Sequence, residues 1–371
     1  MRILVDYRPA LRARTGVGEY MHELIRAYTA AYDDEVTAFT SSWKDRPSPG
    51  LGAAVGARVV DRRVPVSLLN FLWHRLAWPP AEILAGDVDV VHAAHPLLIP
   101  ATRAAQVVTI HDLFFLAHPE QTRREIRRDY ARLVGHHARR ADAVITSSAH
   151  TKDLVSERLG VAADRVYVCP PGAPTWRSLG RAAHAPVDGY ILFLGTLEAR
   201  KNLGVLLDAY TESIRAARRM PRLLIAGGAT PDAAPWLDRI SRAPLKDIVS
   251  CAGYVADEDR ERLYAGARAV VLPSLDEGFG LTVLEAMSAG IAVVASNRGS
   301  LPEVIGAGGV VLDPHDAAGW ASAIERVSSD ADWAEALGRA GLERARAFTW
   351  ARTATHVHEA YTDAVRRRGE R

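Results

Sequence analysis

Apolar and polar positions follow two alternating patterns along the chain. Short, nearly continuous apolar runs such as residues 3–5, 107–111 and 269–272 predict buried strands, and longer segments with apolar residues at helical spacing lie between them. Strands that alternate with helices predict a parallel sheet covered on both faces. The pattern therefore predicts an α/β protein.

The alternation occurs twice, with an interruption in the middle. The expected strands are residues 3–5, 36–39, 58–60, 88–92, 107–111, 143–146 and 166–169, then 190–194, 223–226, 248–251, 269–272, 291–295 and 310–312. The first expected helix opens at the turn at residues 14–20 and ends near residue 31. The others lie near residues 68–84, 123–140, 151–159, 257–265, 281–289 and 317–327. Residues 170–188 are rich in Pro and Gly and have no periodicity. They predict a linker, which places a first domain at residues 1–172, the linker at 173–189 and a second domain at 190–350.

Composition narrows the class of protein. The 371 residues carry a formal net charge of +2, which argues against a nucleic-acid partner for the chain as a whole. The two cysteines, Cys169 and Cys251, are far apart in the sequence and have no metal-ligand spacing, which fits a reducing cytoplasm. The first residues enter a predicted strand directly, without a signal-peptide pattern, and no apolar run is long enough to span a bilayer. We therefore expect a cytoplasmic protein.

Residues 273–290, PSLDEGFGLTVLEAMSAG, form the most informative stretch. They follow one apolar strand and precede another, with a Gly-rich turn that passes into a helix and ends at Gly290. In an open parallel sheet, ligands bind at the carboxyl ends of strands, where such turns lie. Gly278 and Gly280 allow close approach of backbone N–H groups, and the helix adds the positive end of its dipole. The stretch therefore predicts a phosphate site.

Two carboxylates flank this turn. Glu277 lies in the turn and Glu285 lies within the predicted helix. Both cannot bind the phosphate, because like charges repel, so hydroxyl groups of a ribose or another sugar are the better partners. This combination suits a nucleotide sugar. On spacing alone, an ordinary strand-to-helix turn with an acid near the helix N-terminus explains the same residues.

The segment EGFGLTVLEAMSAG resembles the E-x7-E motif of retaining glycosyltransferases of family 4, which have the GT-B fold. The resemblance extends to PPG at residues 170–172, to SNRGSLPE at 296–303 and to a C-terminal helix at 351–368 that completes the first domain. It implies two Rossmann-like parallel-sheet domains that face a cleft, with the nucleotide sugar on the second domain and the acceptor on the first. Glu277 would hold hydroxyls of the donor sugar and Glu285 the ribose. The other expected donor contacts in this segment are Gly278, Phe279, Gly280, Leu281 and Thr282.

A second loop, GTLEARKN, follows the strand at residues 190–194. Adjacent cations such as Arg200 and Lys201 are usually solvated surface charges. A departing nucleoside diphosphate gains negative charge, however, and placed cations stabilise it where water is excluded. The loop, which begins at Gly195, resembles the family's donor loop, and Lys201 matches the catalytic lysine of that loop. Thr196 stands where many members carry Arg, so either Arg200 replaces that charge or assistance to the leaving group is weaker.

Two loops of the first half match family segments. TIHDLFFLAHPE resembles the family's TxHD segment, which implies that His111 hydrogen-bonds to the reacting sugar. Asp112 would then orient the imidazole ring of His111 or contact the acceptor. A lone loop histidine is more often structural. In TGVGEY, Gly16 and Gly18 match the family's Gly-rich loop and become candidate donor contacts. A nicotinamide enzyme is the weaker explanation of these glycines, because Met21 stands where a third glycine belongs.

The nucleobase is expected next to the strand at 248–251. The family uses backbone groups here, which points to Tyr254 and Val255. Asp257 has two interpretations: it accepts from the N1–H and N2–H₂ edge of guanine, which would favour a GDP donor, or it is the N-cap of the next helix. The cap is the favoured alternative. GTLEARKN is similar to mannosyltransferase forms of the loop and favours GDP-mannose weakly, with a UDP-sugar as the alternative.

No metal is expected. Asp87-Val88-Asp89 imitates a D-x-D metal motif, but it lies at the amino end of its strand, and His92, His95 and His118 lack ligand spacing. No cofactor other than the donor is predicted.

Two segments have two interpretations: either they contact a membrane surface, or they are an ordinary core helix and a solvated basic helix. One is apolar and aromatic, at residues 68–78. The other is a basic helix face formed by Arg123, Arg124, Arg127, Arg128, Arg132, His136, Arg139 and Arg140.

The sequence thus predicts a retaining hexosyltransferase that acts by front-face transfer, in polysaccharide or glycoconjugate biosynthesis. Its acceptor, a glycan, a lipid-linked glycan or a small molecule, stays open. Two alternatives from other classes remain: a GT-B sugar-nucleotide epimerase and a non-catalytic nucleotide-sugar-binding protein.

Overall fold

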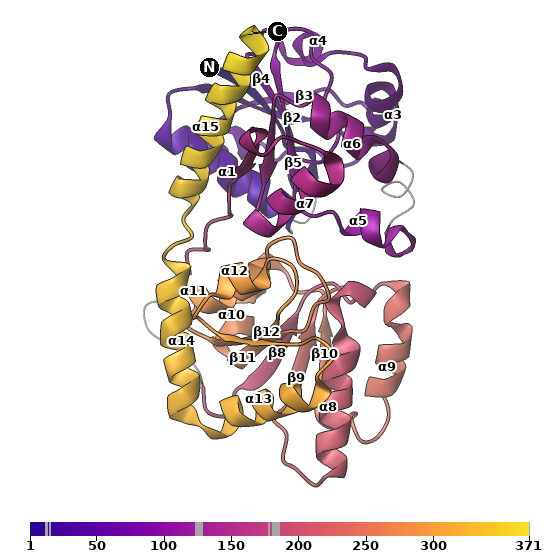
Figure 1. Ribbon diagram of the computed structural model, residues 1–371, viewed down its shortest axis with the longest axis vertical. Coiled ribbons are helices and arrows are strands. Elements are labelled where there is room, and N and C mark those ends of the chain that lie inside the picture. Colours follow the sequence, from indigo (N-terminus) through magenta and orange to yellow (C-terminus); the bar gives the residue numbers. More distant parts are fainter. Residues whose placement is uncertain (12–13, 15, 123–128, 177–178, 180–185, 371) are drawn as a thin grey trace. The chain divides into compact units, whose positions relative to one another are not determined.

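The computed structural model describes the chain except for residues 12–13, 15, 123–128, 177–178, 180–185 and 371. The chain divides into two compact units (Figure 1). Unit 1 comprises Met1–Gly172 together with Thr349–Arg371, and unit 2 comprises Ala173–Phe348. The C-terminal segment therefore belongs to the same unit as the N-terminus.

Unit 1 is built on a parallel seven-stranded sheet with the strand order β3-β2-β1-β4-β5-β6-β7. Its strands are β1 (Arg2–Asp6), β2 (Glu35–Thr40), β3 (Arg58–Asp61), β4 (Val90–Ala93), β5 (Ala105–Ile110), β6 (Ala143–Thr146) and β7 (Val166–Val168). The order reverses between β1 and β4, so the carboxyl ends of these two strands flank a topological switch point, where ligands of open α/β sheets bind.

Helices pack on both faces of this sheet. They are α1 (Val17–Ala31), α2 (Leu51–Val55), α3 (Val66–Phe71), α4 (Ala81–Ala85), α5 (Phe114–Ala117), α6 (Ala131–Arg140), α7 (Ala149–Leu159) and α15 (Trp350–Gly369). Helix α15 lies alongside α1 (Figure 1). The buried Tyr361 of α15 bonds His92 of β4, at 2.6 Å between the Tyr hydroxyl and Nδ1, which fixes α15 against the sheet.

The single helix expected at residues 68–84 is wrong. Helix α3 passes into a π-helical segment, η2 (Leu72–Leu76), and α4 is separate. The break has a local cause: Ala77 adopts a left-handed conformation, and Pro79 and Pro80, which follow, have no N–H to continue a helix. The helix expected at residues 123–140 is described only in part, because residues 123–128 lie outside the described residues.

Unit 2 has a parallel six-stranded sheet with the order β10-β9-β8-β11-β12-β13. Its strands are β8 (Tyr190–Leu194), β9 (Leu223–Ala226), β10 (Val249–Gly253), β11 (Ala267–Leu272), β12 (Ala292–Ser296) and β13 (Val310–Leu312). The switch point lies between β8 and β11. The two loops that the sequence singled out, after β8 and after β11, are therefore neighbours.

The helices of unit 2 are α8 (Leu203–Arg215), α9 (Ala234–Ile240), α10 (Asp257–Ala265), α11 (Leu281–Ser288), α12 (Leu301–Ile305), α13 (Ala317–Ser329) and α14 (Ala331–Ala345). Residues on either face of the sheet form separate hydrophobic clusters, with Trp320 in one and Met287 in the other. The predicted stop after α11 is confirmed, because Gly290 has a φ of +70°. Within the described residues, no helix is both long and apolar enough to cross a membrane.

Candidate active site

Three loops at the carboxyl edge of the unit 2 sheet are bonded to one another. The backbone N–H of Leu275, after β11, donates to the Arg200 carbonyl, after β8, at 2.8 Å. The hydroxyl of Ser296, at the end of β12, donates to the Ser274 carbonyl at 2.5 Å. The Asn202 amide donates to the Pro273 carbonyl at 3.1 Å. The loops therefore form one braced surface next to the switch point.

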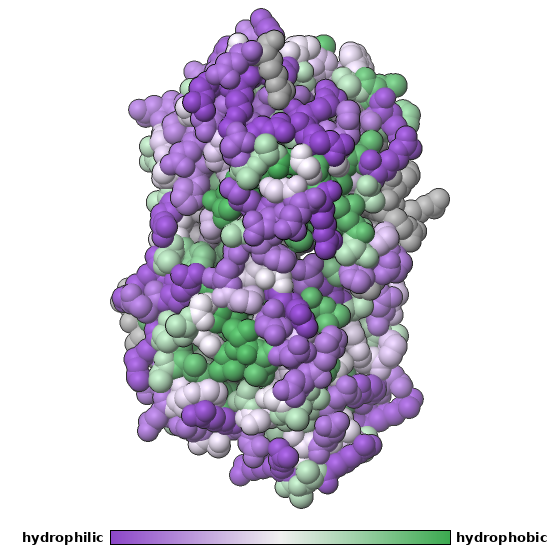
Figure 2. Space-filling model, viewed as in Figure 1, coloured by the Kyte–Doolittle hydropathy of each residue, from purple (hydrophilic) through white to green (hydrophobic). Residues whose placement is uncertain are grey.

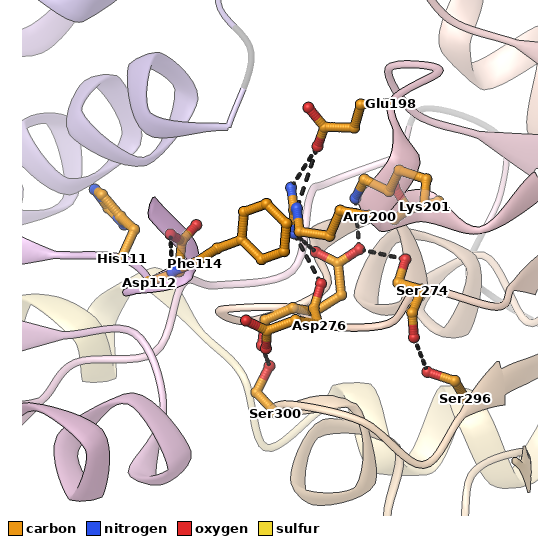
Figure 3. A network of polar contacts seen from close by, with 12 residues as sticks. His111, Asp112, Phe114, Glu198, Arg200, Lys201, Ser274, Asp276, Ser296 and Ser300 are labelled. Atoms are coloured by element: carbon orange, nitrogen blue, oxygen red, sulfur yellow. Dashed lines mark hydrogen bonds and ion pairs between the residues drawn. The ribbon is translucent and has the colours of Figure 1, made fainter. Parts of the chain in front are cut away.

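Glu277 lies at the centre of this surface and is 6% exposed. Its Oε1 accepts from Lys201 Nζ at 2.5 Å and from the Ser274 hydroxyl at 2.7 Å, and its Oε2 accepts from Arg200 Nη1 at 3.0 Å. Figure 3 shows Arg200, Lys201 and Ser274 converging, with dashed lines for these bonds. The structure thus brings Glu277 together with Arg200 and Lys201, which the sequence placed on a separate loop.

The charge of Glu277 is held firmly. Burial alone would raise the pKa of this carboxyl group, but the nearby charges of Lys201 and Arg200, with hydrogen bonds from Lys201 and Ser274, lower it to about 2. Glu277 is therefore ionised at neutral pH and serves as the shared counterion of two cations. An uncompensated charge at this depth would be strongly destabilising.

Arg200 is fixed at three points. Besides Glu277, its Nη1 donates to the Asp276 carbonyl at 2.9 Å, and its Nη2 donates to Glu198 Oε1 at 2.8 Å. Lys201 runs past Gly195, where a Cβ would lie 3.6 Å from the lysine Cε. Thr196 is exposed and supplies no charge. Arg200 and Lys201 are thus both positioned by Glu277.

Glu285 lies on α11 and is also buried. Its Oε2 accepts from the Tyr264 hydroxyl at 2.5 Å, and its Oε1 accepts from Arg260. Both partners come from α10, where their four-residue spacing places them on one face. The two glutamates of the motif therefore have separate partners, cations of a loop for one and a neighbouring helix for the other.

The Gly-rich turn connects these glutamates. Gly280 is the N-cap of α11 with a φ of +94°, and a Cβ there would lie 2.6 Å from Leu301 Cδ2, so both conformation and space favour glycine. The Thr282 hydroxyl donates to the Leu194 carbonyl at the end of β8, at 3.3 Å. Phe279 is buried against Phe348, at 5.7 Å between ring centroids. Gly278 and Leu281 lie in the same turn and first helical position.

The predicted nucleobase contacts follow β10. Tyr254 is 59% exposed and Val255 is partly buried. Asp257 is the first residue of α10, after Ala256, and its side chain lies outside the described part of the structure, so both interpretations of Asp257 stay predictions.

The carboxyl edge of unit 1 carries His111, which directly follows β5. Burial lowers the pKa of His111 to about 4, against a smaller opposing effect from the backbone of Ala94, so the ring is neutral at pH 7. Its Nε2 is buried and has no hydrogen-bond partner among the described residues.

The other unit 1 candidates have local structural roles. The Asp112 carboxylate accepts from the Phe114 N–H at 3.2 Å, at the start of α5. Gly16 is the N-cap of α1, with a φ of +48°. A Cβ on Gly18 would lie 2.8 Å from the Pro9 carbonyl oxygen, so this glycine permits α1 to pack against that segment.

Sequence reasoning missed Ser274, Glu198, Arg260 and Tyr264, which position the motif residues. It also missed a buried pair at the end of β1, where Arg8 Nε bonds Asp6 Oδ1 at 2.7 Å. The spacing of Arg260 and Tyr264 is visible in the sequence, but a helical face does not reveal which neighbouring helix it meets. No signal in the sequence pairs Glu198 with Arg200 across a single turn.

No group of three or more metal-ligating side chains is found among the described residues. The two aspartates of the D-x-D sequence at residues 87–89 form ion pairs instead. Asp89 accepts from Arg2 at 2.9 Å and Asp87 accepts from Arg103 at 2.8 Å, at the amino end of β4. The interpretation of this motif as the start of a strand is confirmed.

Comparison with known proteins gives matches over both units. The family described as "Glycosyltransferase Family 4" matches residues 14–177, and "Glycosyl transferases group 1" matches residues 188–330. A D-inositol 3-phosphate glycosyltransferase of Corynebacterium aurimucosum is 30% identical over 302 residues, which are 75% of this chain and 67% of that protein. The chain belongs to glycosyltransferase family 4.

Further matches agree with this family 4 assignment. O-antigen chain mannosyltransferase B of Escherichia coli is 29% identical over 97% of this chain and 99% of its own length. Among solved structures, sucrose-phosphate synthase of Thermosynechococcus elongatus aligns with a TM-score of 0.73 at 23% identity, covering 98% of both chains. Anabaena HepE in complex with UDP and glucose gives 0.72 at 19% identity, covering 98% of this chain and 99% of its own. The family 4 chain is thus a hexosyltransferase with the GT-B fold of two Rossmann-like parallel-sheet domains.

Proposed function

We propose that this enzyme transfers a hexose, with mannose favoured, from a nucleotide sugar to a hydroxyl group of an acceptor, with retention of the anomeric configuration. The observation that carries the proposal is the buried cluster of Glu277, Lys201 and Arg200 beside the N-terminus of α11. Two fixed cations beside the N-terminus of a helix form a site for a diphosphate. The carboxylate that holds them can also accept from sugar hydroxyls.

In the proposed reaction, the bond between the anomeric carbon and the diphosphate oxygen breaks. The acceptor oxygen bonds to the same face of that carbon, and its proton passes to the departing phosphate oxygen, so no separate protein base is needed. Lys201 and Arg200 stabilise the charge that develops on the diphosphate, where they act without reorganising. We propose that these cations make a metal ion unnecessary.

Glu285 is proposed to hold the ribose. Each of its carboxylate oxygens already accepts one bond, from Arg260 or Tyr264, and each keeps a further lone pair. These two partners fix the carboxylate in one orientation before the donor binds. A fixed carboxylate that accepts from neighbouring ribose hydroxyls loses little conformational entropy on binding.

The mannosyltransferase of E. coli among the relatives supports mannose as the sugar, and GDP-mannose as the favoured donor. HepE, whose structure contains UDP and glucose, keeps a UDP-sugar as the alternative. His111 Nε2, which is buried without a hydrogen-bond partner among the described residues, is proposed to bond a hydroxyl of the donor sugar. The donor can be identified before the acceptor is known, because binding of the nucleotide does not require an acceptor in the proposed site.

A thermal-shift panel of GDP, UDP, GDP-mannose and UDP-glucose tests the proposal, since a ligand that binds the native state raises the melting temperature. We expect GDP and GDP-mannose to give the largest shifts. A nucleotide-sugar transfer assay with candidate glycans then follows. Conversion of the nucleotide sugar without an acceptor would indicate an epimerase instead, and binding without turnover would indicate a non-catalytic protein.

Peripheral membrane contact is proposed for a second surface, on unit 1. The inner face of the α3–η2 helix buries Leu69 and Trp73, yet its outer face is also apolar, with Phe71 and Leu76 more than half exposed. A solvent-exposed helix normally carries polar residues on its outer face. Figure 2 shows hydrophobic and hydrophilic residues side by side where Figure 1 labels α3.

The charges around this surface favour an anionic bilayer. Residues 43–83 contain six Lys or Arg against three Asp or Glu. Trp78 and Trp43 are exposed, and the loop that carries Trp43 is tied to the same surface by Ser41, whose hydroxyl donates to the Val64 carbonyl at 2.8 Å. Tryptophans beside basic residues are typical of a bilayer interface.

Sedimentation with vesicles tests this contact. The wild-type protein should bind vesicles that contain phosphatidylglycerol at low salt, and the variant Phe71→Ser/Trp78→Ser should not. Leu237→Ser, which changes an exposed apolar residue of unit 2, is the control and should bind as the wild type does. Absence of binding by the wild type contradicts the proposal, and a dimer that the double variant abolishes would show that a second copy covers the surface.

A further inference from the structure

Tyr20 lies directly against His111. It belongs to α1, two residues after Gly18, and is 3% exposed. The ring centroids of Tyr20 and His111 are 5.2 Å apart, and the ring planes meet at 81°, an edge-to-face contact. This arrangement is favoured by the aromatic quadrupoles, and it depends on the orientation of both rings.

Tyr20 is itself held by two other segments of unit 1. Its hydroxyl donates to the Cys169 carbonyl at 3.0 Å, and its ring packs on Trp350 at 5.8 Å between centroids. These segments are in contact too, because a Cβ on Gly172 would lie 2.3 Å from the Trp350 nitrogen. The chain leaves unit 1 after Gly172 and returns at Thr349, so the two segments that Tyr20 contacts are those at which the chain leaves and re-enters unit 1.

His111 needs such support. The Nε2 atom of its ring is buried and has no hydrogen-bond partner among the described residues. No hydrogen bond at this atom therefore fixes the tilt of the imidazole. The edge-to-face contact with Tyr20 limits this tilt and so sets the direction in which Nε2 points.

We propose that Tyr20 is a positioning residue for His111, whose ring it holds in the single orientation that the proposed contact with the donor sugar requires. The inference rests on the proposed role of His111 in that contact. Tyr20 does not touch the substrate. Its effect should therefore appear in the transfer step, and donor affinity, which is set mainly by the diphosphate and ribose contacts of unit 2, should change little.

Substitution of Tyr20 tests the proposal in the intact enzyme. In Tyr20→Leu the ring contact is lost, and kcat should fall about threefold to tenfold, the range expected for one aromatic pair, while KM for the donor changes less than about twofold. Tyr20→Phe keeps the ring and should retain most of kcat. Tyr20→Met, a flexible side chain of similar size, replaces the Leu variant should that variant fail to fold.

Tyr28→Leu is the matched control, because Tyr28 lies on the same helix and is equally buried but packs on Tyr361, away from His111. It should lower the melting temperature about as much as Tyr20→Leu does and leave kcat unchanged. An equal loss of kcat in both variants would mean that Tyr20 only stabilises unit 1, which overturns the proposal.

A double-mutant cycle separates positioning from the role of His111 itself. In the His111→Ala background, Tyr20→Leu should have no further effect on kcat, and the side-chain NMR signals of His111 should shift in Tyr20→Leu but not in Tyr20→Phe. A full additional loss in the His111→Ala background overturns the positioning role alone. Full activity of His111→Ala overturns both the proposed role of His111 and the inference built on it.

Discussion

Replacement of Glu277 by glutamine should reveal the strength of the ion cluster. Gln keeps the size of the side chain but leaves Lys201 and Arg200 without their shared counterion. The cluster lowers the pKa of Glu277 from 4.5 to about 2. Since Glu277 is almost fully buried, little solvent screening applies, and the difference corresponds to about 3 kcal/mol of folding free energy.

The sign of the pH dependence follows from the lowered pKa. The contribution of Glu277 is fully present above about pH 4.5, the ordinary value, and is lost as the pH falls through about 2. The difference in stability between wild type and Glu277→Gln should therefore be largest at neutral pH and shrink over this window. Hydrogen exchange of the β11 and α11 amides, followed by mass spectrometry, reports the opening of unit 2 specifically.

Glu335→Gln is the control for this measurement. Glu335 forms an exposed ion pair with Arg339 on α14 of the same unit, and such pairs contribute about 0–1 kcal/mol. A deficit for Glu277→Gln no larger than that of Glu335→Gln at pH 7, or one that persists unchanged at pH 2, would refute the reasoning.

Three further predictions concern the same site. Lys201→Ala should lower transfer by roughly 10²–10³-fold and Arg200→Ala should also impair it, because each removes a placed cation; full activity of Lys201→Ala in the transfer assay would contradict its role. Transfer should survive excess EDTA, whereas loss that Mg²⁺ or Mn²⁺ restores would contradict a cation-only site. Gly280→Ala should destabilise unit 2 by about 1–3 kcal/mol, because of its φ of +94° and the close Leu301; an unchanged melting temperature would show that the turn relaxes freely.

Much of the fold followed from local pattern. Each apolar run that predicted a strand corresponds to one, because parallel strands buried on both faces leave a nearly continuous apolar signature. The motif glutamates and the two cations could likewise be chosen in advance, since strand ends next to Gly-rich turns mark the carboxyl edge of the sheet. The short helices α2, α5, α9 and α12 and the long α14 were missed.

Contacts between distant elements could not be predicted. Glu277 and Lys201 are 76 residues apart, and nothing in either loop states that the lysine meets the carboxylate rather than water. Tyr20 comes from helix α1 and His111 from the loop after β5, and the TGVGEY segment drew attention to its glycines rather than its tyrosine. Such pairings depend on strand order and helix packing, which a period in the sequence does not encode.

Calorimetric titration with GDP and GDP-mannose tests the central claim most directly. The wild type should bind both, and Glu285→Ala should weaken both by roughly tenfold to a hundredfold, the range of about 1.5–3 kcal/mol for charge-assisted bonds to the shared ribose. Glu277→Ala should lose turnover of the sugar but keep most of the affinity for GDP, because Arg200 retains its bonds to the Asp276 carbonyl and Glu198 and Lys201 still packs beside Gly195. Equal loss of GDP affinity in both variants, or no loss in either, would contradict the assignment of the two glutamates to different parts of one donor.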